Sequence, residues 1–310
     1  MLQYVFKRIL MMIPVLLGIS FILFAVMSLT PGDPARIILG EYATEQDVET
    51  LREELGLNEN FVVRYVDYVG DAVQGDFGQS YRTKLPVGEE LMARFPTTLK
   101  LAFIAILIAI VIGIPIGIIS AIKQYSLIDG ASLVSALVLT SMPSFWMGLM
   151  LMLIFSTKLN LLPATGLAQW QCYIMPSVTL AAGTLATLIR MMRSTMLEVV
   201  TQDYIRTARA KGASENRIIF KHALRNALLP VITVIGIDFG VLLGGAVIVE
   251  SVFAVPGIGS WMIAAVKMKD IPVVMASVLF IAFVGGAINL LVDIIYIYID
   301  PRIKSQYVKG

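Results

Sequence analysis

The sequence predicts an all-α integral membrane protein with six transmembrane helices. Its mean hydropathy is +0.82 and only 15% of its residues are charged, whereas soluble domains carry about a quarter charged residues. Its apolar runs approach or exceed the roughly 20 residues that a helix needs to cross a bilayer, and they lack the alternating polarity of barrel strands. These runs lie at residues 9–29, 101–122, 131–157, 173–189, 227–249 and 273–299, with one carboxylate in each of the last two.

The first run follows Lys7 and Arg8, as the apolar core of a signal peptide would. It is longer than such a core and has no clear cleavage site, so we expect it to remain as the first span. With six spans and the N-terminus inside, the short inner segments hold 14 Lys or Arg and the short outer loops hold 4. The positive-inside rule then predicts a multi-pass protein with both termini in the cytoplasm.

The spans divide the chain into three regions. Residues 1–29 are the N-terminus and first transmembrane helix, and residues 30–98 form an extracytoplasmic segment. Residues 99–310 form the transmembrane core, which includes a cytoplasmic loop at residues 193–226. The outer segment carries 13 acidic and six basic residues, so the formal net charge of +2 conceals an acidic outside and a basic inside.

The outer segment is predicted to be helical. Asp33 is placed to cap a helix that begins at Pro34, and "TEQD" resembles a capping box at the start of a helix that Gly56 would end. A further helix is expected over residues 59–74. The segment has too few apolar residues for a large core, so it is either a cap packed over the ends of the spans or a docking surface for an outer partner.

The inner loop contains the densest basic stretch of the chain, "DYIRTARAKGASENRIIFKHALRNALLP" at residues 203–230, with six Lys or Arg and the only histidine, His222. Gly212 separates two helix-compatible segments, and Ser214 is a suitable N-cap for the second. An apolar side is expected from Ile205, Ala208, Ile218, Ile219 and Leu224. The pattern predicts either a basic helix–turn–helix unit that docks a partner or a loop that only sets topology.

The residue inventory argues against enzymatic chemistry. The chain has no "GxxxxGK[ST]" loop to cradle the phosphates of ATP. One cysteine, Cys172, and one histidine cannot form a Cys-cluster metal site or a His/Cys catalytic centre. We therefore expect no catalytic residue, no metal ligand, no cofactor on this chain and no binding to nucleic acid.

Several motifs, in order along the chain, resemble those of a known family: "PGDPAR", "GDFGQS", "FPTTLKLA", "SMPSFWMG", "LPATG", "YIMPSVTLA", "DYIRTARAKG", "ESVFAVPGIG" and "NLLVDIIYIYIDPRI". The family is the permease subunits of bacterial ATP-binding-cassette importers of the dipeptide, oligopeptide and nickel group, which also includes glutathione importers. The resemblance covers essentially the whole chain. It implies a type I importer permease-like fold in the bacterial cytoplasmic (inner) membrane.

The resemblance also implies a heteromeric complex. Its members would be a second homologous permease subunit, two cytoplasmic ATP-binding subunits that hold ATP and Mg, and an extracytoplasmic substrate-binding protein, all surrounded by membrane lipid. The inner loop would be the coupling helix region that sits in a groove of an ATPase. Its expected coupling residues are Tyr204, Arg206, Ala208, Arg209, Lys211, Gly212 and Arg217. Arg206 stands where the general family signature has Glu, and Thr207 where it has the first Ala, a departure that fits the peptide and nickel branch.

Asp238 lies near the middle of the fifth span, where a charge costs at least about 2.5 kcal/mol unless it faces water, a partner or the bundle interior. It is either a hydrogen-bonded structural acid or part of the translocation path, where it would meet an ammonium or a cation of the substrate. Small peptides are the first expectation, with glutathione or chelated nickel as alternatives for the same machinery. The rival class is an ion-coupled secondary transporter that uses Asp238, but such carriers commonly have internal repeats, and none is evident here.

Overall fold

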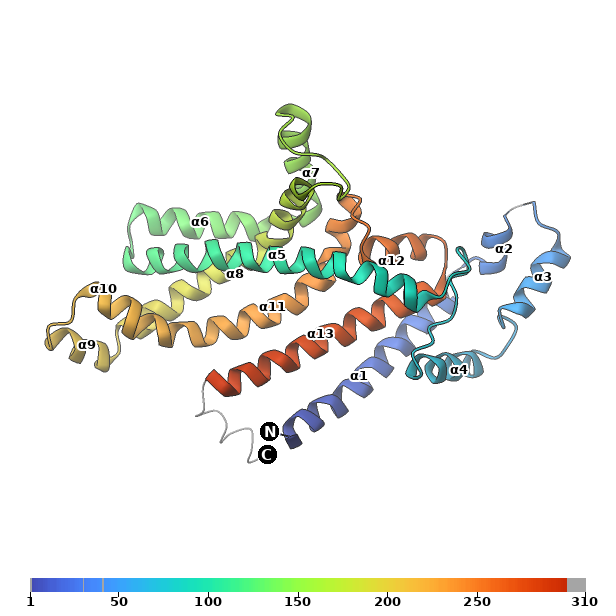
Figure 1. Cartoon of the computed structure of the whole chain (residues 1–310), viewed down its shortest axis with the longest axis horizontal. Coiled ribbons are helices and arrows are strands. Elements are labelled where there is room, and N and C mark those ends of the chain that lie inside the picture. Colours follow the sequence, from blue (N-terminus) through green and yellow to red (C-terminus); the bar gives the residue numbers. More distant parts are fainter. Residues whose placement is uncertain (1, 30, 41, 300–310) are drawn as a thin grey trace. The chain divides into compact units, whose positions relative to one another are not determined.

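The computed structural model describes residues 2–29, 31–40 and 42–299, and in these residues the regular structure is helical, apart from an isolated bridge between Gln79 and Pro86. Figure 1 labels the α-helices, with bounds α1 Leu2–Leu29, α2 Pro34–Leu39, α3 Glu45–Glu54, α4 Phe61–Val73, α5 Val87–Ile122, α6 Leu127–Ser141, α7 Ser144–Leu151, α8 Ile174–Val200, α9 Asp203–Ala210, α10 Glu215–Arg217, α11 Leu224–Val252, α12 Ile258–Lys267 and α13 Ile271–Ile299. Two π-helical segments, η1 Met152–Lys158 and η3 Ile218–Ala223, and a 3-10 helix, η2 Trp170–Tyr173, complete the list.

Five helices are long and apolar enough to cross a membrane, and the number is six if one bent pair of helices is counted as a single span. The expected third span, residues 131–157, is not one continuous helix. It breaks between α6 and α7, and the two halves meet at an angle of 103°. Pro143 explains the break: the residue before a proline is pushed out of the α region, and Met142 has the extended dihedrals φ −81° and ψ 126°.

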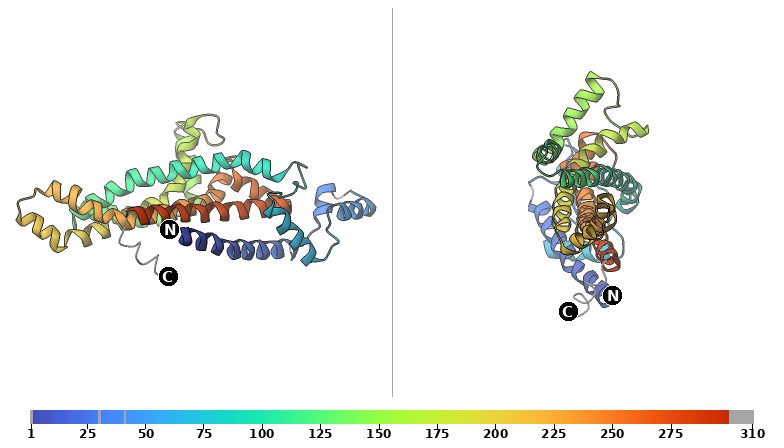
Figure 2. Two further views of the ribbon diagram at one scale, coloured as in Figure 1. Left: turned by 60° about the horizontal axis from the view of Figure 1, so that its bottom comes forward. Right: turned by 90° about the vertical axis from the view of Figure 1, so that its left-hand side faces the viewer.

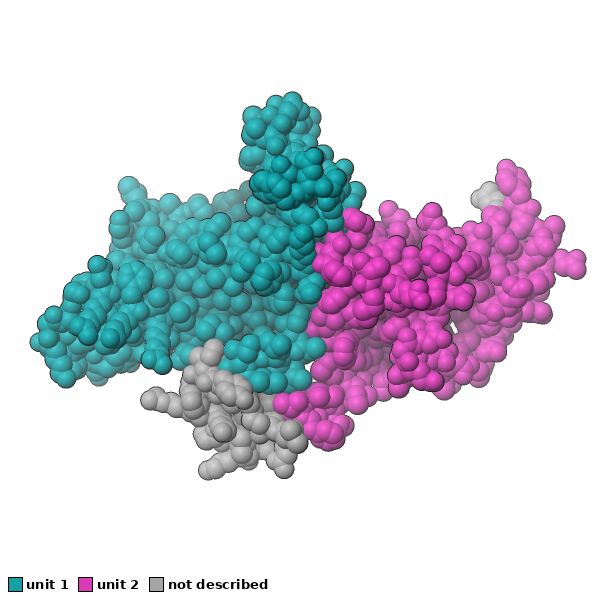
Figure 3. All heavy atoms as spheres, viewed as in Figure 1, with its two compact units in different colours: residues 1–4, 99–255, 285–310 teal, residues 5–98, 256–284 magenta. Residues whose placement is uncertain are grey.

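The described chain forms two compact units, coloured separately in Figure 3. One contains residues 99–255 and 285–299, together with residues 2–4. The other contains residues 5–98 and 256–284. We describe each by itself.

In the first unit α8 is the central helix, with 67% of its most apolar window buried. The "GIPIG" motif of α5 lets that helix approach α8 closely. A Cβ on Gly117 would lie 2.6 Å from the Cβ of Met192, and one on Gly113 would lie 3.0 Å from the Cβ of Leu188. These small residues therefore allow close packing of the two helices. The glycines of "VLLGGA" differ, since neither Gly244 nor Gly245 makes so close an approach.

The second unit begins with the outer helices, whose starts match the sequence signals. Asp33 accepts a hydrogen bond from the backbone N–H of Ala35 at 3.1 Å, and Asn60 caps α4 at Val62 at 3.0 Å. Thr44 caps α3 by accepting from the N–H of Asp47, but its hydroxyl also donates to the Asp47 carboxylate, so the reciprocal half of a capping box is missing. Gly56, at φ +63°, follows the end of α3 as expected.

Asp270 anchors the loop that leads into α5. This residue is only 4% exposed and directly precedes α13. It accepts hydrogen bonds from the hydroxyl of Ser80 at 2.5 Å and from the backbone N–H of Tyr81 at 3.1 Å. Burial raises the pKa of the neighbouring Tyr81 phenol to about 12. The "GDFGQS" loop is thus held in place by a buried carboxylate about 190 residues away in the sequence.

Candidate functional site

The basic loop between α8 and α11 folds as a small projection, which we call the knob. It consists of α9, α10 and η3. Figure 1 and the left panel of Figure 2 show α9 and α10 beyond the ends of these two helices. α9 ends in a turn at Gly212, which has φ +82°, and the N–H groups of Gly212 and Ala213 donate to the carbonyls of Arg209 and Ala208. Ser214 occupies the N-cap position of α10, but its side chain makes no capping hydrogen bond. The expected helix, glycine turn and second helix are present.

The second helix differs from expectation in its continuation. α10 has only three α-helical residues, and the chain then passes through the π-helical segment η3 before α11 begins at Leu224. π-Helical turns are frequent at functional sites and interrupt the regular hydrogen-bond ladder of a helix. The knob therefore joins α11 through an irregular segment.

An apolar base fixes the knob to the end of α8. Ile205 of α9 and Ile218 of η3 are completely buried, and they share a hydrophobic cluster with Met192 and Met196 of α8. Ala208 and Leu224 pack against the same cluster, as the sequence pattern predicted for the apolar side. This burial gives the basic loop a fixed position on the two spans.

Two of the expected coupling residues are tied to neighbours within the knob. The amide of Asn226 donates to the Tyr204 hydroxyl at 2.7 Å. Arg209 donates from Nε to the Glu215 carboxylate at 2.8 Å, across the Gly212 turn, and this hydrogen bond raises the pKa of the guanidinium further. Both contacts stabilise the shape of the knob.

The other expected coupling residues are of two kinds, exposed and half-buried. Arg206, Lys211 and Arg217 are exposed, and within the described residues the only ion pair among them is a long one of 3.7 Å between Arg206 and Asp203. Gly212 is also exposed, and a Cβ there would have no neighbour within 4 Å. Ala208, in contrast, is half-buried and faces the hydrophobic cluster at the base of the knob. The knob thus has three exposed cationic side chains on its surface and an apolar base.

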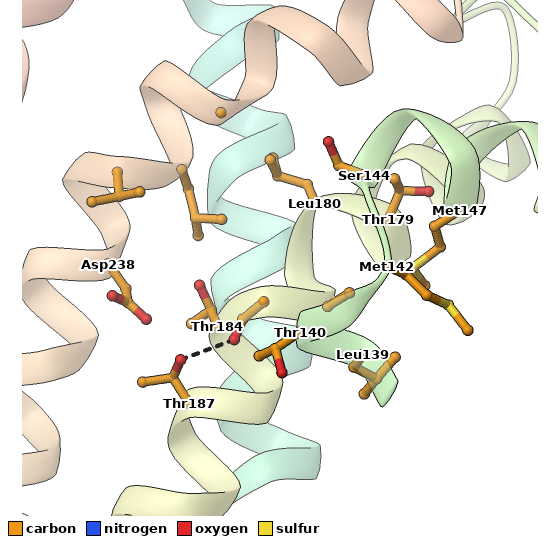
Figure 4. Close-up of a pocket in the computed structure, with 15 residues that line it drawn as sticks. Leu139, Thr140, Met142, Ser144, Met147, Thr179, Leu180, Thr184, Thr187 and Asp238 are labelled. Atoms are coloured by element: carbon orange, nitrogen blue, oxygen red, sulfur yellow. Dashed lines mark hydrogen bonds between the residues drawn. The ribbon is translucent and has the colours of Figure 1, made fainter. Parts of the chain in front are cut away.

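Asp238 borders a pocket of about 380 Å³ in the first unit. The pocket is formed by the end of α6, by α7, α8 and α11, and Figure 4 shows Asp238 across from Thr184 and Thr187. Asp238 is the 15th of the 29 residues of α11, so it lies near the midpoint of that span. The side chain of Thr184 lies close to this carboxylate in Figure 4. The charge therefore faces a cavity and a hydroxyl group rather than lipid alone.

The threonines around the pocket are arranged as hydrogen-bond acceptors. Thr140, Thr179 and Thr187 each donate their hydroxyl proton to the backbone carbonyl four residues earlier, at 3.0, 2.8 and 3.0 Å. Their oxygen lone pairs remain for a ligand. Together with one carboxylate, this lining suits a molecule that offers N–H donors. No His or Cys lines the pocket, and no group of three potential metal-ligating side chains occurs among the described residues.

Sequence reasoning missed a buried ion pair in the first unit, in the half of α8 that leads to the knob. Arg193 of α8 binds Asp129 of α6 through two hydrogen bonds, Nε to Oδ1 at 2.6 Å and Nη2 to Oδ2 at 2.9 Å. In the sequence Arg193 was only one of the positive charges that set topology. The available signal was the single carboxylate in the first turn of an apolar run, "SLIDGASLV", which has no need of a charge for membrane insertion.

Comparison with known proteins identifies the family. Residues 113–305 match "Binding-protein-dependent transport system inner membrane component", and residues 1–102 match "Binding-prot-dependent transport system membrane comp, N-term". The chain belongs to this family. The expected fold and the expected class of importer permease are therefore confirmed, as is a multi-pass location in the inner membrane.

Relatives cover almost the whole permease. It is 43% identical to the "Dipeptide transport system permease protein DppB" of Alkalihalophilus pseudofirmus, over 98% of this chain and 100% of the relative. It is 42% identical to the "Glutathione transport system permease protein GsiC" of Escherichia coli K12, over 99% and 100%. Among solved structures, a chain of the inward-facing MetNI methionine ABC transporter matches with a TM-score of 0.58 at 21% identity, covering 68% of this chain and 96% of that one. That last likeness is one of fold.

Proposed function

We propose that the permease forms one half of a translocation pore together with a second homologous permease, and that two cytoplasmic ATPases drive it. An extracytoplasmic binding protein delivers the substrate, and both termini lie in the cytoplasm. The observation that carries this proposal is the knob, which places exposed Arg206, Lys211 and Arg217 over an apolar base rooted in α8 and α11. A loop that only set topology would not need a buried base.

The knob supplies the mechanical connection. ATP and Mg bind to the partner ATPases, and closure of the two ATPases moves the groove in which each knob sits. Because Ile205 and Ile218 pack on Met192 and Met196, the end of α8 moves with the knob. The pocket beside Asp238 is formed partly by the same helix, at residues 179–187, so its shape changes with the movement of α8.

The proposed substrate is a small peptide, with glutathione included in that class. A peptide offers an α-ammonium and amide N–H groups, and the pocket offers one carboxylate and several hydroxyl acceptors. The names of the dipeptide and glutathione relatives support this choice. Chelated nickel remains the alternative. Selection among peptides belongs to the binding protein.

An Asp238→Asn substitution tests the energy source and the pocket together. Asparagine keeps the size and a hydrogen-bonding group but removes the charge. With ATP inside proteoliposomes, the binding protein outside and no ion gradient, we expect the Asn variant of the assembled complex to accumulate peptide, at a rate reduced by roughly two- to tenfold, the range of one partly solvated charge contact. Substrate-stimulated ATP hydrolysis should persist.

The exposed Asp71 of α4 provides a matched control, since Asp71→Asn makes the same chemical change outside the pocket. This control should transport at the rate of the unmodified complex. Accumulation that ignores ATP and requires an imposed pH gradient, with complete loss in the Asp238→Asn variant, would instead establish an ion-coupled carrier.

A further inference from the structure

The buried ion pair between Asp129 and Arg193 closes a small network at the inner ends of three spans. Asp129 is 3% exposed, and the side chain of Arg193 is 19% exposed. The Ser120 hydroxyl of α5 donates to Asp129 Oδ1 at 2.6 Å, and the Tyr125 backbone N–H donates to Oδ2 at 2.9 Å. With the two bonds from Arg193, every contact to this carboxylate is a donated hydrogen bond, and α5, α6 and α8 meet at one group.

The turn of α8 that carries Arg193 also carries the base of the knob. Met192 and Met196 are fully buried in the cluster that holds Ile205 and Ile218. Gly117 of α5 also approaches Met192 closely, because it has no side chain of its own. A displacement of the knob must therefore displace the turn that contains Arg193.

α6 leads from Asp129 to the pocket. Asp129 is in the first turn of this helix, and Leu139 and Thr140 in its last turn line the pocket beside Asp238. Thr140 is 11 positions after Asp129, which corresponds to about 16 Å of helix. One continuous helix thus connects the carboxylate that Arg193 holds to a wall of the cavity.

We propose that Asp129 and Arg193 are positioning residues for transport, which make α6 move with the knob-bearing end of α8 and so carry the movement of the knob to the pocket wall. The inference rests on the proposed function of the knob. A planar, two-point contact suits this role because it resists rotation and sliding between helices, whereas a single apolar contact allows both. Ser120 extends the same constraint to α5.

The test must separate positioning from simple stability, because removing one partner of a buried pair destabilises a protein strongly. Replacing both partners by apolar residues of similar size is often tolerated. The informative variant is therefore the double substitution Asp129→Leu with Arg193→Met, beside the conservative Arg193→Lys. Arg190→Met serves as the matched control, because Arg190 is exposed one turn away on α8 and makes no ion pair within the described part of the chain.

The measured quantity is the amount of peptide transported per ATP hydrolysed in proteoliposomes. For the double variant we expect normal assembly, retained ATP hydrolysis and a fall in this ratio of roughly three- to thirtyfold, the range found for residues that couple distant sites. The ratio for Arg193→Lys should lie between those of the double variant and the unmodified complex. The ratio for Arg190→Met should equal that of the unmodified complex. A double variant with an unchanged ratio would overturn the proposal.

A distance measurement gives a second readout that does not use transport. Spin labels at the exposed positions Gly130 and Arg190 report the separation of the inner ends of α6 and α8 in the assembled complex. This separation should stay constant between the ATP-bound and nucleotide-free states when the pair is intact, and change in the double variant. A constant separation in both would refute the inference, whereas failure of the unmodified complex to hydrolyse ATP in response to substrate would refute the proposed function instead.

Discussion

Two charged helical regions, the pair α2 and α3 and the knob, use their charges in different ways. In the outer helices α2 and α3, Arg36 pairs with Glu45, and Arg52 pairs with Asp33 at 2.9 Å and with Glu49 at 3.2 Å. In the knob, the only close ion pair among the described residues is Arg209 with Glu215, and its remaining basic side chains are exposed. The charges of α2 and α3 join helix to helix, whereas most basic side chains of the knob make no ion pair among the described residues.

The difference also appears in the way each region is fixed. The knob is anchored by the fully buried Ile205 and Ile218, so its stability depends less on ion pairs. The core of the outer helices is small, with Ala35, Val48 and Leu51 as its buried members, so ion pairs carry more of the cohesion. Similar charge density therefore predicts binding in one region and structural support in the other.

The largest effect is expected from Gly212→Val in the knob. A residue other than glycine at φ +82° costs about 1–2 kcal/mol, and a β-branched side chain costs more. Because a Cβ there would meet no neighbouring atom, the strain is purely that of the backbone. We expect uptake to fall by roughly tenfold or more, converted from that strain, while the permease still inserts in the membrane. Co-purification with the ATPases and uptake in proteoliposomes are the measurements.

Two control variants sharpen this prediction. Gly212→Asn should recover much of the uptake, because asparagine tolerates a left-handed backbone. Gly130→Val also has open space around its Cβ but no positive φ, so it should have little effect. If Gly212→Val kept both ATPase association and uptake, the knob would not be the coupling element.

The local features of both regions were predictable from sequence. The sequence signals were the caps Asp33 and Thr44 and the turn at Gly212, and each depends on residues within a few positions of one another. The expected helices begin and end close to these signals. The apolar base of the knob followed from spacing alone. Short-range hydrogen bonding and helical periodicity determine such features, so a single sequence contains the information.

The long-range contacts were not predictable. The contact between Asp129 and Arg193 joins residues 64 positions apart, and the contact between Asp270 and Ser80 joins residues 190 positions apart. No pattern along a single sequence encodes such a pairing. The break at Pro143 was readable only in part, because prolines in membrane helices often produce a kink that leaves the helix continuous. For the site, Asp238 could be named as an unusual charge, but the threonines that face it depend on how α8 packs on α11.

A smaller effect is expected from Arg52→Met in the outer helices. The substitution removes both ion pairs of this guanidinium, whose pKa is raised by its hydrogen bond to Glu49 and by the charge of Asp33. Local opening of α2 and α3 should become roughly two- to fivefold more frequent, the range for partly exposed ion pairs. Hydrogen exchange across residues 34–54 would detect it.

The Arg52→Met variant tests whether the two ion pairs of Arg52 act only on local structure. ATPase association should remain unchanged, since the knob does not depend on the outer pairs. Arg64→Met, which removes a guanidinium of α4 that has no ion pair in the described residues, is the matched control and should leave the exchange of α2 and α3 as it was. Exchange that is equally fast in both variants would argue against a structural role for the outer pairs.

The smallest effect concerns the outer charges that are not used for cohesion. Glu53 and Glu54 are exposed at the end of α3 and form no ion pair among the described residues, whereas Glu45 and Glu49 do. If the outer segment docks a binding protein, these two carboxylates act mainly on the rate of encounter, which salt screens over about 8 Å at physiological ionic strength. We expect Glu53→Gln with Glu54→Gln to slow binding-protein-dependent uptake by roughly twofold at low salt and hardly at all at high salt. The measurement is the uptake rate as a function of salt concentration. If the variant matched the unmodified complex at every salt concentration, this surface would not be part of the docking site. The outer helices would then be only a cap over the spans.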